Sequence, residues 1–289
     1  MSTSNWRATA CALAALLAVV SVSTAFAADN GDDPDAEMRK LPWQNGPATG
    51  DVGTRSTLRV PDGARLLPES SGARFLELTG NLPEPGQTVL ESDHWWATLS
   101  FKDSGYVKDD EKLDPDALLK SMRDNDEEAN KERQKRGMAT LTLDGWAVPP
   151  HYDPTTKFLE YGIKLHASDS PRPAVNYTVR VLARHGVETV TLVTSADTLD
   201  ADVKVLHDVL ATGFKFNQGE TYGEFKPGDH VAEFGLGALV LGGVAAGAVK
   251  AGWLKGLGAV LLAGWKFVVA GVVALGAGIK RLFGRATGR

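Results

Sequence analysis

The sequence is poor in cysteine, in basic charge and in recognisable catalytic motifs, and each lack excludes a class of protein. Its single cysteine, Cys11, cannot form an intramolecular disulfide, so a disulfide-stabilised scaffold is excluded. The formal net charge of -5 over 289 residues excludes a strongly basic nucleic-acid binder, and we expect no nucleic-acid partner. No G-x-S-x-G, H-E-x-x-H, Walker or dinucleotide-binding motif occurs, so the sequence predicts no cofactor.

The charge is divided unevenly along the chain. Residues 1–27 hold one basic residue and no acidic one. Residues 28–230 hold 23 basic and 35 acidic residues, a net charge of -12, whereas residues 231–289 hold seven basic residues and one acidic residue. This separation is typical of a protein whose segments lie on different sides of a membrane.

The N-terminal residues have the three parts of an export signal. A short segment ending at Arg7 is followed by an apolar stretch from Ala8 to Val22 and by the small residues of Ala25-Phe26-Ala27. We therefore predict that residues 1–27 are a signal peptide and that the main domain lies in the periplasm or at the extracytoplasmic face of a bacterial cell. An uncleaved N-terminal anchor is the alternative.

The C-terminal residues 231–289 predict a membrane anchor with a basic tail. From Gly256 to Ile279, 24 residues contain one charge, at Lys266. As a helix they would extend about 36 Å, enough to cross a hydrocarbon core of about 30 Å. We expect one transmembrane helix in the inner membrane; in the alternative, the shorter apolar run Phe234–Val249 forms the first arm of a helical hairpin.

Between the two ends, the sequence predicts a flexible arm over residues 28–55 and an α+β domain over residues 56–230. The arm is rich in Asp, Gly and Pro and has no apolar periodicity. The domain pattern predicts an antiparallel sheet of hairpins covered by helices. The expected elements are a hairpin at Leu58–Leu67, a helix from Ser70 or Ser71 to Gly80, a strand at Trp95–Phe101, a helix from Asp114 to Arg136, strands at Thr140–Val148, Phe158–His166, Val175–Arg184 and Val187–Thr194, and a helix at Leu199–Gly213.

An acidic loop precedes the predicted helix that begins at Asp114. It contains Asp109, Asp110 and Glu111 and is followed by Asp116. Several carboxylates in one loop are able to bind a divalent cation, although the spacing is not that of an EF-hand. The other interpretation is a solvated loop whose charge matches the helix dipole, and it is the one we favour.

His151 and Asp153 lie in a proline-rich segment and are the candidates for general acid–base catalysis. The alternative is a turn fixed by prolines and by an Asp side-chain hydrogen bond, which we favour because no nucleophile motif accompanies the pair. Asn176, Thr178 and Arg180, together with Arg184, would share one strand face. That face either binds an anionic ligand or is the solvent side of the sheet, and we favour the second.

The chain resembles the bacterial membrane-anchored family called "domain of unknown function 2167" over roughly residues 56–280. The resemblance rests on short motifs that include Gly80-Asn81, Gly105-Tyr106 with Asp109-Asp110, Asn130 with Arg133, Trp146, His151-Tyr152-Asp153, and Asn176-Tyr177 with Arg180. It implies an exported domain held on the inner membrane, and it implies no catalytic residue. The candidate interaction or family-motif residues are Gly105, Tyr106, Asp109, Asp110, Trp146, His151, Tyr152, Asp153, Asn176, Tyr177 and Arg180.

Two functions are compatible with these patterns. We favour a non-enzymatic envelope module that binds an unknown protein partner or a second copy of itself. The alternative is a metal- or His-assisted hydrolase that uses His151, Asp153 and the Asp109/Asp110 loop. The hydrolase requires His151 and Asp109 to share a cleft.

Overall fold

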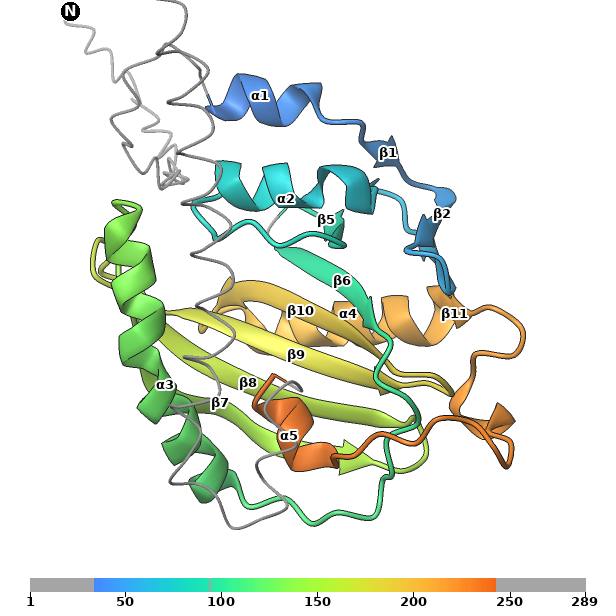
Figure 1. The fold of residues 1–289 in the computed structure, drawn as a ribbon. Helices are drawn as coiled ribbons and strands as arrows, with labels where there is room; N and C mark the ends of the chain where they lie inside the picture. The colour runs from blue at the N-terminus through green and yellow to red at the C-terminus, as the bar shows by residue number, and fades with distance from the viewer. Residues whose placement is uncertain (1–33, 94, 243–289) are drawn as a thin grey trace, which may run out of the picture.

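The computed structural model describes residues 34–93 and 95–242, and its centre is an antiparallel sheet of eight strands (Figure 1). The strand order is β1-β4-β5-β6-β10-β9-β8-β7. The bounds are β1 Gln44–Asn45, β4 Arg65–Leu67, β5 Thr88–Glu91, β6 Trp96–Lys102, β7 Leu141–Asp153, β8 Phe158–Ala167, β9 Ala174–Leu182 and β10 Val187–Ser195. The predicted α+β class is confirmed.

The strands β7 to β10 form three successive hairpins, as the alternating pattern predicts. The turn between β9 and β10 is closed by a bond from the N–H of Ala183 to the carbonyl of Gly186 at 2.9 Å, so Arg184 and His185 are its central residues. A Cβ atom at Gly186 would lie 2.0 Å from the carbonyl oxygen of Lys102, so only glycine lets β6 run this close to the turn.

One side of the sheet, which we call the α4 face, is covered by helix α4 (Leu199–Gly213) and by a second sheet of three strands. The second sheet has the order β11-β3-β2, with β2 Ala48–Val52, β3 Ser56–Val60 and β11 Phe214–Phe216. The main hydrophobic core lies between these layers and includes Leu99, Val179, Leu192 and Leu206.

The opposite side, which we call the groove face, is covered only in part. Helices α1 (Pro34–Lys40) and α2 (Glu69–Leu78) lie over one end, and α3 (Pro115–Lys135) lies along β7 at the other (Figure 1). Helix α5 (Leu236–Val240) packs over β7 and β8 beside the first turns of α3. A short 3-10 helix, η1 (Tyr222–Glu224), joins the α5 cluster.

Residues 34–55 differ from the expected flexible arm. They form α1, β1 and β2, and Val52 is 1% exposed in the main core. The expected hairpin at Leu58–Leu67 also differs, because β3 pairs with β2 and β11 whereas β4 pairs with β1 and β5. The turn after Val60 therefore connects two sheets instead of closing a hairpin.

The described part of the expected anchor belongs to the domain. Leu236, Leu239 and Val240 of α5 are buried against the large sheet, so the apolar run that begins at Phe234 fills a protein core at its start. Residues 256–279, the expected membrane span, lie outside the described residues. Within 34–93 and 95–242, no helix has the length and apolar character needed to cross a membrane.

Helix α3 protects the edge strand β7 through side-chain hydrogen bonds. Asn130 Nδ2 donates to the carbonyl of Leu141 at 2.7 Å, and the N–H of Leu141 donates to Asn130 Oδ1 at 2.8 Å. Arg123 donates to the carbonyl of Asp144 at 2.6 Å. The Asn130 amide thus binds the backbone of Leu141 as a neighbouring strand would.

Replacing Asn130 with alanine is expected to destabilise the protein by about 2 kcal/mol, because two backbone groups of Leu141 lose their partner. Asn130→Asp is expected to have a similar effect, since a carboxylate cannot donate to the carbonyl. The free energy of unfolding from urea titration measures the change. Gln134→Ala, at an exposed position of α3, is the control and should be near neutral; equal stability of the Asn130 and Gln134 variants would contradict the assignment.

Candidate functional site

The hydrolase candidates His151 and Asp109 lie on opposite faces of the sheet. On β7, His151 is opposite Glu160 and Tyr152 is opposite Leu159 of β8. Glu160 contacts α4, whereas Leu159 packs in the cluster with α5. Asp109 is bonded to Tyr152 and therefore lies on the groove face. The residues expected for a hydrolase do not form one site.

Asp109 forms an ion pair with Lys157 on the groove face, beside the β7–β8 turn. Its Oδ2 accepts a hydrogen bond from the Tyr152 hydroxyl at 2.7 Å and one from Lys157 Nζ at 3.0 Å. Burial opposes ionisation, but the bonds from Tyr152 and Lys157 outweigh it and lower the pKa of Asp109. Burial and the nearby carboxylate raise the pKa of Tyr152 well above its usual value. The Asp109 carboxylate is ionised and paired with Lys157, and the Tyr152 hydroxyl stays protonated. Both groups hold the loop in place.

Gly105 and Tyr106 attach the C-terminal residues to the same cluster. The Tyr106 ring stacks on Tyr222 with 4.3 Å between centroids, and its N–H donates to the carbonyl of His230 at 2.8 Å. Gly105 has φ +82°, and a Cβ atom there would lie 2.4 Å from His230 Nδ1. This position requires glycine, so Gly105 and Tyr106 have packing roles.

The carboxylates of the acidic loop have separate partners. Glu111 Oε2 accepts the N–H of Gly237 at 3.1 Å, Asp110 is exposed, and Asp114 caps α3 by accepting from the N–H of Ala117 at 3.1 Å. Among the residues that the structure describes, no three His, Cys, Asp or Glu side chains are grouped to hold a metal ion. The favoured interpretation of Asp114 as a helix cap is confirmed.

Asp153 and Trp146 also have structural partners. Asp153 Oδ1 accepts from the N–H of Thr155 at 2.8 Å, which fixes the turn between β7 and β8. Trp146 Nε1 donates to the carbonyl of Pro115 at the start of α3 at 3.0 Å. The predicted turn is confirmed at Asp153, but Pro149-Pro150 lie inside β7 rather than in the turn.

A polar cluster on the α4 face was missed by sequence reasoning. The carboxylate of Glu160, 5% exposed, accepts hydrogen bonds from the Tyr177 hydroxyl and from His207 Nε2, the latter at 2.7 Å. The hydrogen bond to Glu160 raises the pKa of His207 although burial opposes it. Glu160 and His207 are 47 positions apart and carry no motif, so only the pairing of β8 with β9 under α4 brings them together.

The variant His207→Gln is expected to lower stability by about 1 kcal/mol at pH 5.5 and by less at pH 8.5. The raised pKa means that the imidazolium–Glu160 bond stabilises the fold fully below the unfolded-state pKa and that this stability is lost as the pH rises through the folded-state value. The effect is modest because the imidazole is 42% exposed. Urea midpoints at the two pH values measure it, and a loss that does not change with pH would contradict the charge assignment.

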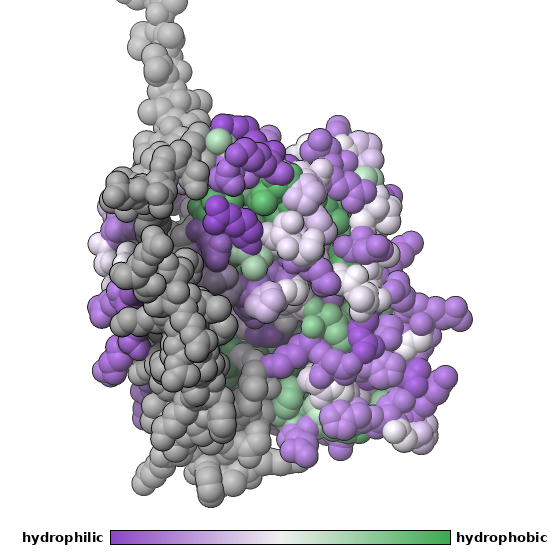
Figure 2. Space-filling view, turned by 45° about the horizontal axis from the view of Figure 1, so that its top comes forward, coloured by the Kyte–Doolittle hydropathy of each residue, from purple (hydrophilic) through white to green (hydrophobic). Residues whose placement is uncertain are grey.

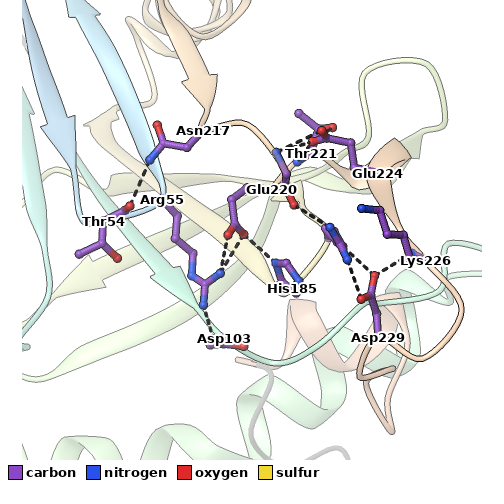
Figure 3. Close-up of polar contacts among 12 residues, drawn as sticks. Thr54, Arg55, Asp103, His185, Asn217, Glu220, Thr221, Glu224, Lys226 and Asp229 are labelled. Carbon is purple, nitrogen blue, oxygen red and sulfur yellow. Dashed lines mark hydrogen bonds and ion pairs between the residues drawn. The ribbon is translucent and has the colours of Figure 1, made fainter.

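A network of ion pairs joins the β9–β10 turn to the segment after β11 (Figure 3). Arg184 binds Asp229 through two bonds of 2.7 and 2.8 Å, and Arg55 binds Glu220 at 2.8 and 2.9 Å. His185 Nδ1 lies 2.9 Å from Glu220. Arg184 therefore follows the end of β9 and does not share a strand face with Arg180, contrary to expectation.

A groove of about 590 Å³ crosses the groove face between α2 and the end of α3. Trp96, Thr98 and Asn176 contribute to its floor from β6 and β9, and Asn81 and Arg133 contribute to its walls. Arg133 Nε donates to the carbonyl of Ala139 at 2.5 Å. Asn81, Arg133 and Asn176 come from three separate motifs of the sequence, and the fold brings them to one groove.

The face drawn in Figure 2 is mainly polar. Hydrophilic side chains make up most of the described residues visible there, and hydrophobic residues are seen mainly in recesses between them. Val205, 45% exposed on α4, and Phe225, 36% exposed after η1, are the exposed large hydrophobic residues of the described ranges. The groove is a concave region of this surface with the volume of a small-ligand site, as is a second hollow of about 520 Å³ whose lining includes Ala64 and Glu91.

Comparisons with known proteins agree with the predicted family. A family model described as "Protein of unknown function (DUF2167)" matches residues 44–276, and so includes part of the segment that we expected to be an arm. The solution structure of cyanobacterial PsbP (CyanoP) from Synechocystis sp. PCC 6803 is similar at 14% identity and a TM-score of 0.34, covering 58% of this chain and 95% of that chain. The comparison with curated proteins gave no match.

Proposed function

The chain belongs to the DUF2167 family, and from this premise we propose that it is a non-enzymatic binding module of the bacterial envelope. Its groove face takes an extended segment of a protein partner. A C-terminal helix holds the module on the inner membrane, with the domain in the periplasm.

The observation that carries this proposal is the groove itself. It is open, it runs across strands, and it presents the side-chain amide of Asn176 and the amide oxygen of Asn81 beside the indole of Trp96. The Asn81 Nδ2 atom donates to the carbonyl and the hydroxyl of Thr79 at 3.2 and 3.1 Å. Amide groups both donate and accept hydrogen bonds, which suits a peptide backbone, and an indole supplies apolar contact area. Charges of both signs, at Glu84 and Arg172, line the groove as well.

The three side chains that the sequence suggests for a hydrolase do not share a site. Asp109 is held by Tyr152 and Lys157, and Asp153 fixes a turn. His151 is exposed on the α4 face, away from Asp109. These contacts favour the binding module over the hydrolase.

The location rests on the two ends of the sequence, which lie outside the described residues. The pattern of residues 1–27 supports export, and the apolar run of residues 256–279 followed by basic residues supports anchoring with a cytoplasmic C-terminus. An alkaline phosphatase fused after Arg289 should be inactive, and activity there would overturn the single-span topology.

Site-specific photo-crosslinking tests the binding function. A photoreactive amino acid at Thr98 in the full-length protein should give a crosslinked product of defined mass in intact cells, and the same residue at Val205 on the α4 face should not. Adding Asn176→Ala should reduce the yield at Thr98 severalfold without changing the unfolding temperature. The groove would be refuted as the binding surface by equal products from Thr98 and Val205. It would also be refuted if neither Thr98 nor a second groove position, Asn81, gave a product.

A further inference from the structure

Two cationic side chains on the groove face flank the same strand. Arg180 on β9 is opposite Thr189 of β10, and Thr189 is opposite Ser100 of β6 on its other side. Lys102 is two residues beyond Ser100, so it shares the face with Arg180. With β10 between them, the two backbones are about 10 Å apart, a distance that both long side chains reach across.

The hydrogen-bond partners of Arg180 are neutral. One terminal nitrogen donates to Thr189 Oγ1 at 2.8 Å, and the other donates to the Tyr161 hydroxyl at 3.3 Å. Its Nε is buried and has no hydrogen-bond partner in the described structure. Arg180 as a whole is half-buried, but a buried guanidinium nitrogen without an acceptor is costly, so this arrangement favours a negative partner.

Lys102 adds a second positive charge to the same space. Burial, and then repulsion from Arg180, lower the pKa of Lys102. No carboxylate lies within ion-pair distance of Lys102 or Arg180 in residues 34–93 and 95–242. Glu84 attracts Lys102 electrostatically, but less strongly than Arg180 repels it, and it forms no ion pair with Lys102. Two like charges are therefore held together by the fold without a directly bound carboxylate among the side chains that the structure describes.

The floor around the two cations is made of apolar and hydroxyl-bearing residues. Val187 lies opposite Lys102 and Leu159 lies opposite Arg180. The hydroxyl-bearing positions of this face on β6, β10, β9 and β8 are Ser100, Thr189, Thr191, Thr178 and Tyr161. None of them is acidic, although the region 28–230 has a net charge of -12. Hydroxyl groups donate hydrogen bonds to anions. This part of the surface is therefore suited to an anion, although the net charge of the region 28–230 is negative. Thr191 also lines the groove, which makes the two features continuous.

We propose that Arg180 and Lys102 bind an oxyanion, a phosphate or carboxylate group, with the surrounding hydroxyls as additional donors. The planar guanidinium of Arg180 presents donors in the geometry that such groups accept, and Lys102 supplies a second charge. This site goes beyond the protein-binding groove and does not depend on it.

Anion titration of the full-length protein in neutral detergent tests the site. Sodium phosphate and sodium acetate are titrated against sodium chloride at constant ionic strength, and the unfolding temperature is followed. Phosphate or acetate at a hundred times its Kd should raise that temperature by roughly 5 °C. A third arm compares nanodiscs of phosphatidylcholine with nanodiscs containing phosphatidylglycerol; a rise confined to this arm identifies a lipid headgroup as the source of the oxyanion.

Variants decide whether the response belongs to this site. Arg180→Gln and Lys102→Gln should each remove most of the rise, whereas Arg59→Gln, at an exposed position of β3, should keep it. Lys102→Glu supplies an internal carboxylate to Arg180, so it should raise the unfolding temperature in chloride and abolish the response even if Arg180→Gln does not fold. The proposal is overturned if no arm gives a rise, or if the Lys102 variants respond as the wild type does.

Discussion

Replacing Glu188 with glutamine is expected to flatten the pH dependence of stability between about pH 4.5 and pH 8. Glu188 lies on β10 and is 0% exposed in the core between the large sheet and β3. Its Oε2 accepts a 3.4 Å bond from Ser56, and its Oε1 has no hydrogen-bond partner in the described structure.

Burial explains the direction of the effect. It raises the pKa of Glu188 from 4.5 to about 8, against a smaller opposite contribution from Ser56. Below pH 4.5 the carboxyl is neutral in both states and its contribution is fully present. As the pH rises through this window, the unfolded state loses a proton that the folded state keeps. Stability then falls by about 1 kcal/mol per pH unit, on the order of 3 kcal/mol in total.

Urea unfolding at several pH values measures the Glu188 effect. Glu188→Gln should be at most as stable as the wild type near pH 5 and clearly more stable near pH 8.5. Glu233→Gln, at an exposed position, is the matched control and should follow the wild-type profile. Parallel profiles for Glu188→Gln and the wild type would show that the carboxyl is not held neutral.

The variant Gly72→Ala is expected to destabilise the protein by about 3 kcal/mol. Helix propensity alone predicts the opposite, since alanine is favoured over glycine in a helix interior by about 1 kcal/mol. In α2, however, a Cβ atom at Gly72 would lie 1.8 Å from the carbonyl oxygen of Gln87. The clash is with a backbone carbonyl and not with a flexible side chain, so a local rotation cannot relieve it. Helix α2 therefore has to move away from the segment before β5.

Thermal unfolding of Gly72→Ala against Gly223→Ala tests this contact. Gly223 lies in η1, where a Cβ atom meets no heavy atom within 4 Å, so its substitution should be near neutral. The movement of α2 should also disturb Phe75, whose ring is 5.2 Å from that of Trp96 in the groove. An increase in stability for Gly72→Ala would show that propensity outweighs the close approach.

The hairpin strands and the two long helices were predictable because their signals are local. Alternating residues in β7 to β10 and the cap–proline pair Asp114-Pro115 specify their elements within a few residues. The β9–β10 hairpin is joined by a short turn as well, whose central residues are Arg184 and His185. For these segments the antiparallel order follows from short connections alone.

The N-terminal strands were not predictable in this way. β1 and β2 are short, contain Gly50, and gain their stability from pairing with β4 and β3 rather than from any periodicity of their own. The same limit applies to β3 and β4, whose intervening turn resembles that of a hairpin. Long-range pairing overrides the local pattern in both cases.

The candidate sites show a similar division. The sequence identifies Asp109 and His151 as chemically capable, but strand alternation puts them on opposite faces. Register also explains Glu188, which shares a face with Val190 and Leu192 and is therefore buried. The alternation of Asn176, Thr178 and Arg180 placed them on one strand face, which we favoured as the solvent side of the sheet. In the structure this is the groove face, where Thr178 is 5% exposed, and the walls of the groove come from distant segments that no spacing connects.

The covered edge of β7 has a consequence for assembly. A long exposed edge strand invites another chain to add to the sheet, and sheet proteins are prone to aggregate through such edges. Here three register irregularities interrupt the pairing of β7 with β8. Asn130 of α3 also takes up the backbone hydrogen bonds of Leu141 at the free edge of β7. At the other edge of the sheet, β1 has only two residues. Polymerisation by continuing the eight-stranded sheet is thereby disfavoured. At high protein concentration the eight-stranded sheet is therefore protected at both edges against the addition of further chains.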